Sequence, residues 1–269
     1  MRVLVTAEEV RHQVDVARRR GDRVGLVPTR GDLHDGHASL VRHARAQCDL
    51  VLVTIVRPDG SPAFHERSDE SVARNAGADL LWRPMPGPLV TNASLRVVPT
   101  RRPELADLAT AAAQQLGIVR PDVAYAGEEH YDHARLLRDV ARDLLLPVEV
   151  RMTATPRDPD GIPVGAASRE LDATTRADAA AIPRALEAVA RSVQEGERSL
   201  FRLRARAEGR LADGGSALEV EDVATVDPAT FEPVDVFDRP VLMVVRAKVA
   251  GMPVVDSRLL EPTAAAADA

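Results

Sequence analysis

The spacing of hydrophobic residues alternates between two periods along residues 1–155. Short apolar runs such as DLVLVTIV at 49–56 are typical of strands covered on both faces, whereas Val10, Val14 and Ala17 fall on one face of a helical segment. The pattern predicts strands at 22–29, 49–56, 80–84, 122–127 and 148–155, and helices at 7–20, 34–46, 68–78, 104–116 and 130–144. Residues 1–7 can form a short strand or lead into the first helix. Strands that alternate with helices indicate a parallel sheet, so we predict an α/β fold for this part of the chain.

The pattern changes near residue 170. Beyond it, the spacing predicts one long helix at 174–195, a second helix at 199–212, and strands at 218–226 and 241–249. Two helices followed by neighbouring strands predict a smaller α+β domain. We therefore predict two domains, residues 1–170 and residues 171–269.

The composition excludes several classes of function. The chain has 269 residues, 45% of them hydrophobic, and a formal net charge of −6, so it can form two cores but has no basic excess for a nucleic-acid partner. Aromatic residues make up 3%, too few for a base-stacking surface. No run approaches the roughly 20 apolar residues that span a bilayer, so we expect no membrane partner. Because Cys48 is the single cysteine, we predict no internal disulfide and a cytoplasmic location.

The first candidate site is the sequence His34-Asp35-Gly36-His37, which follows a predicted strand and opens a predicted helix. Ligands bind at this edge of an open parallel sheet, and the N-terminus of a helix offers N–H groups to an anion. Gly36 allows a close approach to the backbone. Two imidazoles one turn apart can bind the same phosphate and stabilise charge on it. We therefore favour nucleotide chemistry at His34 and His37.

Two plainer interpretations compete with a phosphate site. An H-x-x-H sequence at the start of a helix is often a helix cap with two surface histidines. Histidines one turn apart could also ligate a metal ion, but no third ligand is evident nearby. We therefore predict no metal held by these residues.

Four stretches carry a family resemblance, in order along most of the chain. They are VPTRGDLHDGHASLVRHAR at 27–45, VRPDVAYAGEEHYDHARLLRDVARDLLLPVEV at 119–150, RDPDGIPVGAASRELDATTRADA at 157–179 and VVRAKVAGMPVVDSRLLEP at 244–262. Together they resemble the pantothenate synthetase (pantoate–β-alanine ligase) family of nucleotidyltransferase-type adenylate-forming enzymes. The resemblance implies a Rossmann-like domain, a smaller C-terminal α+β domain, and an active site between them.

The family's reaction has two steps: a carboxylate attacks the α-phosphate of ATP to give an acyl adenylate, and an amine then displaces AMP. The resemblance implies ATP with Mg²⁺, a carboxylic acid and an amine as small-molecule partners, and a homodimer. It implies catalytic phosphate contacts from His34, His37 and Arg169. The candidates for nucleotide binding are Pro28, Thr29, Gly36, Gly127 and Ser168, together with Arg30 and His130, where the residue type differs from that of the family. The candidates for substrate binding are His133, Arg57 and His65, of which Arg57 and His65 could equally lie on a loop surface.

Several positions depart from the family pattern. The phosphate-binding lysine falls at Glu129, the ribose-binding aspartate at His130, and a pantoate-binding glutamine at His133; a second glutamine is missing from 57–68. Because the loss of buried hydrogen-bond partners changes which carboxylate a pocket accepts, we expect an acid other than pantoate. Arg30 is expected to supply the positive charge missing at Glu129. Alternatively, the three altered residues act on a different substrate or a metal, or only begin a helix.

The function expected from these observations is an ATP-dependent carboxylate–amine ligase that forms AMP through an acyl adenylate, in a specialised biosynthetic pathway. A pantoate–β-alanine ligase with altered contacts is the alternative within the same class. Two alternatives come from other classes: a non-catalytic relative that binds a nucleotide or a partner protein, and a transferase that passes AMP to a phosphate.

Overall fold

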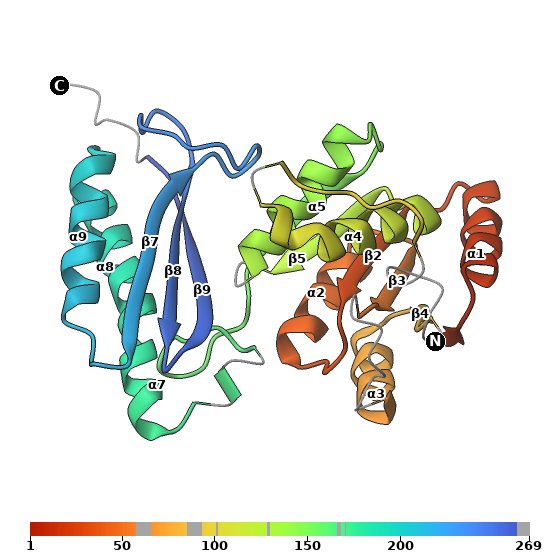
Figure 1. Ribbon diagram of the computed structural model, residues 1–269, viewed down its shortest axis with the longest axis horizontal. Coiled ribbons are helices and arrows are strands. Elements are labelled where there is room, and N and C mark those ends of the chain that lie inside the picture. Colours follow the sequence, from red (N-terminus) through yellow and green to blue (C-terminus); the bar gives the residue numbers. More distant parts are fainter. Residues whose placement is uncertain are drawn as a thin grey trace. The chain divides into compact units, whose positions relative to one another are not determined.

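The computed structural model describes residues 1–57, 66–84, 93–100, 102–127, 130–165, 168–169 and 171–262. The chain forms two compact units (Figure 1). The first comprises Met1–Gly127 and Asp132–Pro156, and the second comprises the chain around His130 and Tyr131 and from Arg157 onward. The domain boundary that the sequence places near residue 170 rests on the change in element pattern, and it stays a prediction.

The first unit is built on a six-stranded sheet in which all neighbouring strands are parallel. The strands lie in the order β1-β4-β3-β2-β5-β6. Their bounds are β1 (Arg2–Leu4), β2 (Val24–Thr29), β3 (Leu50–Ile55), β4 (Leu80–Trp82), β5 (Val123–Gly127) and β6 (Glu149–Thr153). The predicted parallel α/β sheet is therefore confirmed.

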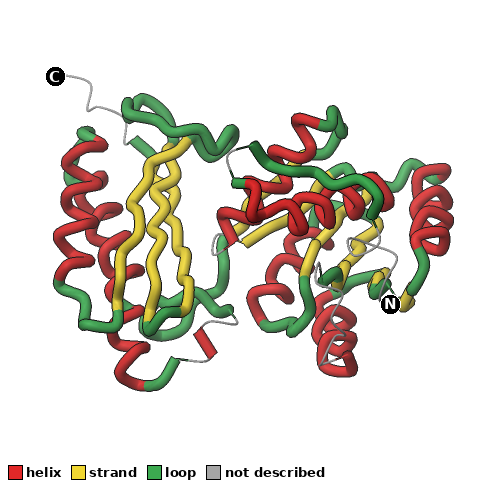
Figure 2. The backbone as a smooth tube through the Cα atoms, in the orientation of Figure 1, coloured by secondary structure: helices red, strands yellow, loops and turns green. Residues whose placement is uncertain are grey.

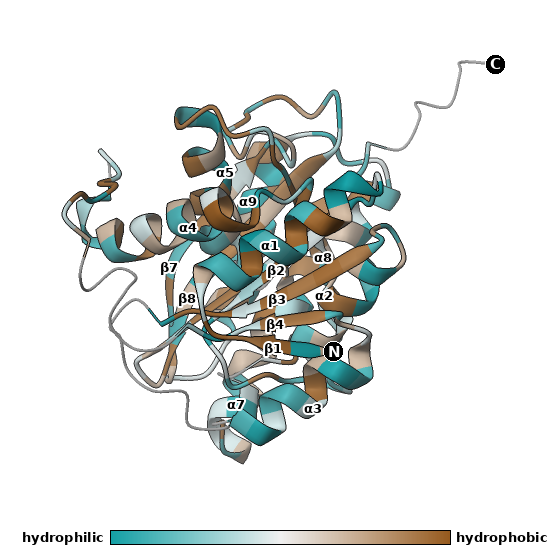
Figure 3. Ribbon diagram, turned by 90° about the vertical axis from the view of Figure 1, so that its right-hand side faces the viewer, coloured by the Kyte–Doolittle hydropathy of each residue, from teal (hydrophilic) through white to brown (hydrophobic). Residues whose placement is uncertain are grey.

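Helices cover both faces of this sheet, because successive residues of a strand point to opposite sides. Leu26 of β2 shares a core with side chains of α1, α4 and α5, whereas Val27 shares another core with those of α2 and α3. Burial on both faces explains why the strands are continuous apolar runs, as Figure 3 shows for β3 and β4. The helices are α1 (Ala7–Arg19), α2 (Asp35–Arg45), α3 (Glu66–Ala76), α4 (Ala106–Val119) and α5 (Tyr131–Asp143), with the short 3-10 turn η2 (Pro103–Leu105) before α4.

The second unit contains a three-stranded antiparallel sheet with helices on one face (Figure 2). Its strands, in order across the sheet, are β7 (Leu218–Val226), β8 (Val241–Val249) and β9 (Met252–Leu260). Leu186 of α8 (Ala181–Gln194) and Leu203 of α9 (Leu200–Ala212) pack with Met243 and Val245 of β8. The predicted smaller α+β arrangement is confirmed. Over the described parts of both units, no helix combines the length and apolar character needed to cross a membrane.

The single long helix predicted at 174–195 is wrong. The structure has two helices, α7 (Ala173–Ala179) and α8, which are separated at Ala180. Pro183 has no N–H to donate to the carbonyl four residues earlier, which belongs to Ala179. The helical ladder is therefore interrupted at this junction, although the apolar spacing runs on through it.

A buried ion pair ties the start of the second unit to its last strand. Arg157 donates from its two terminal nitrogens to the two carboxylate oxygens of Asp256 in β9, at 2.8 Å each. The Asp256 side chain is 1% exposed, and its Oδ1 also accepts from the N–H of Ser257 at 2.8 Å. A two-point arginine–carboxylate contact fixes orientation as well as distance. Arg157 thus anchors the chain that leads to the Ser168 region.

We expect Arg157→Met to lower the free energy of unfolding by about 3 kcal/mol, because it leaves the Asp256 carboxylate buried without its charged partner. Urea denaturation followed by circular dichroism measures the change. The matched control is Lys248→Met, which removes an exposed ion pair with Glu221 in the same unit and should hardly alter the midpoint. Equal effects of the two substitutions would contradict the assignment of Arg157 as an anchor.

Candidate active site

Two buried histidines stand at the carboxyl end of β2. This strand ends at Thr29 and α2 begins at Asp35, so residues 30–34, here called the histidine loop, join them. His34 is the N-cap of α2, with extended backbone, and His37 lies one turn further. Their side chains are largely shielded, with 2% exposure for His34 and 9% for His37, and their ring centroids are 4.0 Å apart. The predicted H-x-x-H spacing therefore brings the two imidazoles into contact.

One hydrogen bond fixes how the His37 ring can act. The backbone N–H of His34 donates to Nδ1 of His37 over 3.4 Å. A backbone N–H is only a donor, so Nδ1 must be unprotonated to accept this bond. The proton of the neutral ring is then on Nε2. His37 can therefore offer an N–H donor to an anion while it remains uncharged.

Side chains at the ends of β2 and β3 hold the first part of the histidine loop. The hydroxyl of Thr29 donates to the carbonyl of Thr54 at 2.6 Å and accepts from the N–H of Gly31 at 3.3 Å. Arg57, which follows β3, donates from Nε to the carbonyl of Arg30 at 3.0 Å. Three of the predicted residues, Thr29, Arg30 and Arg57, thus lie together. In this structure Arg57 contacts the backbone of the loop.

A carboxylate from α3 holds the second part of the loop. Asp69 is 1% exposed, and it accepts from the N–H of Asp32 at 3.2 Å and from the N–H of Leu33 at 2.7 Å. Gly31 has a φ of +89°, and a Cβ there would lie 3.1 Å from Ile55 and 3.2 Å from Asp69. Glycine is favoured at this position because a side chain there would strain the left-handed backbone and its Cβ would press against both neighbours.

The remaining candidates of the first site lie along the chain as follows. Pro28 is buried in β2, and Gly36 is buried in the first turn of α2. Gly127 ends β5, which pairs with β2 in parallel, so it lies at the same edge of the sheet as the histidine loop. His130 immediately precedes α5 and His133 lies in its first turn, and both are half-buried. The positions that fall outside the described residues are His65 and Glu129.

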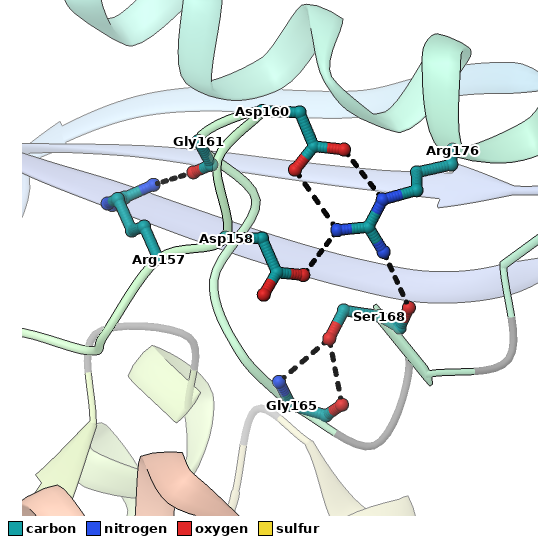
Figure 4. A network of polar contacts seen from close by, with 7 residues as sticks. All are labelled: Arg157, Asp158, Asp160, Gly161, Gly165, Ser168 and Arg176. Carbon is teal, nitrogen blue, oxygen red and sulfur yellow. Dashed lines mark hydrogen bonds and ion pairs between the residues drawn. The ribbon is translucent and has the colours of Figure 1, made fainter. Parts of the chain in front are cut away.

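The second candidate loop belongs to the second unit (Figure 4). The Ser168 hydroxyl accepts from the N–H of Gly165 at 3.0 Å and donates to its carbonyl at 2.9 Å. Ser168 is 6% exposed, whereas its neighbour Arg169 is exposed. The serine hydroxyl therefore closes the loop on itself, and the arginine is the member of the pair that is open to solvent.

Arg176 of α7 fastens this loop to an acidic turn, as Figure 4 shows. Its Nη1 donates to the carbonyl of Ser168 at 3.1 Å. Its Nε and Nη2 donate to the two oxygens of Asp160 at 2.6 Å and 3.0 Å, and Nη2 also contacts Asp158. All three guanidinium nitrogens are thus engaged, which suits a planar group with several donors.

The charges of this network shift the pKa values of its members. Hydrogen bonds first to Asp160 and then to Asp158 raise the pKa of Arg176. For Asp160, partial burial acts to raise the pKa, but the hydrogen bond from Arg176 and the neighbouring backbone N–H groups outweigh it and lower the pKa below its usual value. Both groups are therefore charged at neutral pH, and the charged pair holds the loop.

Sequence reasoning missed two residues that shape these loops. Asp69 lies in a predicted helix, and it shares the buried face of α3 with Ala73 and Ala76. A carboxylate at an apolar position of a helical pattern was a signal that could have identified it. Arg176 gave no such signal, because nothing in the spacing connects it with Asp158 and Asp160.

Comparisons with known proteins agree over almost the whole chain. The family model described as Pantoate-beta-alanine ligase matches residues 2–259. The pantothenate synthetase of Rhizobium johnstonii is 32% identical, with 97% of this chain and 92% of that protein covered. The pantothenate synthetase of Desulfatibacillum aliphaticivorans is also 32% identical, with coverages of 92% and 95%.

Two solved structures are similar to this chain. The pantothenate synthetase from Thermus thermophilus has a TM-score of 0.81 at 26% identity, with 96% of this chain and 99% of that chain covered. The pantoate-beta-alanine ligase from Francisella tularensis, complexed with beta-gamma ATP and beta-alanine, has a TM-score of 0.68 at 18% identity, with coverages of 96% and 97%. At 18% identity the second likeness concerns the fold alone.

The expectation of an acid other than pantoate is not supported by these similarities, since the matched family and the relatives are all named for pantoate chemistry. That expectation rested on His133, in the first turn of α5, and on a glutamine missing from 57–68. A few changed side chains are weak evidence against a family match that extends over residues 2–259.

We expect nitrogen NMR at neutral pH to find His37 with its proton on Nε2 and His43 with its proton on Nδ1. The reason is that Nδ1 of His37 accepts from a backbone N–H, whereas Nδ1 of His43 lies 2.9 Å from the carbonyl of Ser39, which can only accept. Because both histidines are on α2, each is a control for the other. A proton on Nδ1 of neutral His37 would contradict the geometry.

We expect Asp160→Asn to destabilise the protein by an amount that decreases at low pH. Because the pKa of Asp160 is lowered by folding, its charged form contributes stability above the ordinary value of 3.8, and that contribution is lost as the pH falls through the lowered pKa. Urea denaturation of wild type and variant between pH 7 and pH 3 gives the difference. A difference that grows on acidification would contradict this assignment.

Proposed function

The chain belongs to the pantoate–β-alanine ligase family, whose members are ATP-dependent ligases that form amide bonds, and we propose that it joins pantoate to β-alanine. In the first step a carboxylate oxygen of pantoate bonds to the α-phosphorus of ATP, and the bond to the β-phosphate oxygen breaks, so pyrophosphate leaves. In the second step the amine of β-alanine bonds to the acyl carbon and AMP leaves with the former carboxylate oxygen, while the amine loses a proton to solvent.

The observation that carries this proposal is the buried pair of histidines at the carboxyl edge of the sheet. An N–H donor at Nε2 of His37 suits the phosphoryl oxygens, on which negative charge increases as the α-phosphorus is attacked. His34, whose ring lies 4.0 Å from that of His37, is proposed to bind the same group of oxygens. Donors that are already fixed in position stabilise such charge without a cost of rearrangement during the reaction.

We propose further roles for residues around the histidines. Pro28 and Thr29 near the end of β2, Gly127 at the end of β5 and Gly36 in the first turn of α2 shape the nucleotide-binding edge, for which small or rigid residues are suited. The exposed side chain of Arg30 supplies positive charge for the phosphates, while its carbonyl is held by Arg57.

The remaining binding roles follow from position along the chain. His130 and His133, at the start of α5, are proposed to contact the ribose and the acid, respectively, as the family pattern implies. In the second loop the exposed Arg169 is the proposed phosphate ligand. Ser168, whose hydroxyl already donates to Gly165, is proposed to set the conformation of that loop.

Magnesium is proposed to arrive with ATP rather than to occupy a site held by the protein. Mg²⁺ prefers oxygen ligands and usually keeps waters and substrate phosphates in its coordination shell. In the described ranges, no group of three or more His, Cys, Asp or Glu side chains is arranged to hold a metal. The described residues therefore do not fit a resident metal.

The test is product analysis with purified protein, ATP, Mg²⁺, pantoate and β-alanine. We expect AMP, pyrophosphate and pantothenate in equal amounts. His34→Ala and His37→Ala should each lower kcat by about 100-fold or more, because each removes a donor to the transition state. The matched control is His43→Ala, an exposed histidine of the same helix, which should leave kcat unchanged. AMP formation that depends on another acid but not on pantoate would contradict the proposal.

A homodimer, which the family resemblance implies, is also proposed. Light scattering during size-exclusion chromatography would measure the mass in solution, and the mass of a single 29.0 kDa chain would contradict it.

A further inference from the structure

We propose that Asp69 is a positioning residue for the adenylate-forming step, because its carboxylate holds the backbone that carries His34. This inference rests on the proposed function, since it assigns Asp69 to the reaction at the histidine pair. Asp69 does not need to touch ATP or pantoate in order to act. It acts by fixing the backbone of the histidine loop, which positions the two imidazoles.

The contact has the form of an anion bound by a backbone nest. Two successive N–H groups, those of Asp32 and Leu33, point at one carboxylate, with distances of 3.2 Å and 2.7 Å to its two oxygens. Successive N–H groups in a turn form a concavity that binds anions. Here the anion is internal, and the 1% exposure of Asp69 excludes water as a competitor. Hydrogen bonds to a charged acceptor are stronger than neutral ones.

The carboxylate also stabilises a backbone conformation that the sequence alone disfavours. Gly31 and Asp32 both have positive φ values, of +89° and +55°. Two successive residues in this region are uncommon, although aspartate adopts it more readily than most other non-glycine residues. Asp69 accepts from the N–H of Asp32 itself, so it stabilises the loop at the point where the backbone is least favourable.

The backbone that Asp69 holds, at Asp32 and Leu33, is followed in the chain by His34. Leu33 is the neighbour of His34, and the N–H of His34 donates to Nδ1 of His37. A shift of Leu33 would move the N–H of His34, which is the donor of that 3.4 Å bond. Without this bond, the proton of the neutral His37 ring could lie on either nitrogen. The Asp69 carboxylate is therefore connected to the His37 ring through two hydrogen bonds to the loop, the main chain from Leu33 to His34, and the bond from the His34 N–H.

Occupation of the nest by Asp69 has a second consequence for phosphate binding. The amide groups of Asp32 and Leu33 are no longer available to a nucleotide, although they lie in the loop between strand and helix where phosphates often bind. Phosphate oxygens are thereby directed to the imidazoles and the first turn of α2. Asp69 thus contributes to where ATP sits as well as to the shape of the loop.

The experiment compares Asp69→Asn with wild type. Asparagine has nearly the same shape, but its amide nitrogen would face one of the two N–H groups, so only one hydrogen bond can be retained. We expect kcat to fall by about 10- to 100-fold, because small displacements of catalytic groups have effects of this size. The KM for ATP should change less than kcat. The NMR signal of His37 Nδ1 should shift toward that of a nitrogen without a hydrogen bond.

The matched control is Glu70→Gln, the same carboxylate-to-amide change at the next residue of α3. Glu70 pairs with Arg83 at 3.4 Å, and Arg83 keeps Glu66 as a second partner at 3.3 Å. This variant should retain the kcat and the His37 signal of wild type. A folded Asp69→Asn protein with unchanged kcat and unchanged His37 signal would overturn the proposal, as would an equal loss of kcat in both variants.

A measurement on wild type keeps the inference testable if Asp69→Asn does not fold. Hydrogen exchange of the Asp32 and Leu33 amides should be slow compared with that of exposed loop amides, and fast exchange of both would overturn the proposal. Failure of the proposed function is separate, because wild type would then form no AMP with pantoate and β-alanine. In that case the His37 signal and the exchange rates still report whether Asp69 positions the loop.

Discussion

Between the end of β2 and the start of α2 the chain must turn within five residues, and every amide group in that turn needs an acceptor. The amides of residues 31–34 find theirs in the hydroxyl of Thr29, the carboxylate of Asp69 and the ring of His37. Because these acceptors all belong to the protein, the histidine loop has its shape before any ligand arrives. The orientation of both imidazoles depends on that shape, and the chemistry proposed for the site depends on the imidazoles.

The backbone of the second loop is also held by a charged side chain, but here the charge is positive and the backbone group is a carbonyl. At the histidine loop a buried carboxylate binds N–H groups, whereas at Ser168 a guanidinium binds a carbonyl and is itself held by Asp158 and Asp160. In both places a charged side chain from a helix fixes the backbone of a loop that carries a proposed phosphate ligand. The proposed phosphate ligands His34, His37 and Arg169 thus lie on backbone that Asp69 and Arg176 help to fix.

The departures from the family pattern are single substitutions, and they do not remove the chain from its family. Glu129 reverses the charge of a family lysine, and the region of 57–68 lacks a glutamine, yet the chain remains a member of the family over residues 2–259. The cores on the two faces of the parallel sheet and the strand-to-helix turn that bears the histidines are the features that persist. A binding pocket can replace one polar contact with another, which is the role proposed for the exposed side chain of Arg30. Pantoate chemistry therefore remains the proposal that agrees with the fold and the family together.

The sequence by itself determined the order of strands and helices in the first unit, because strands buried on both faces are continuous apolar runs and helices carry their apolar residues on one face. It also indicated the family, and it predicted the H-x-G-H site, since four neighbouring residues carry that motif. The break at Ala180, the tautomer of His37 and the roles of Asp69 and Arg176 were decided only by the tertiary structure. Hydrogen bonds between a side chain and a backbone group 36 or 37 residues away, as at Asp69, leave no periodicity in the sequence. They exist only once packing has brought the two segments together.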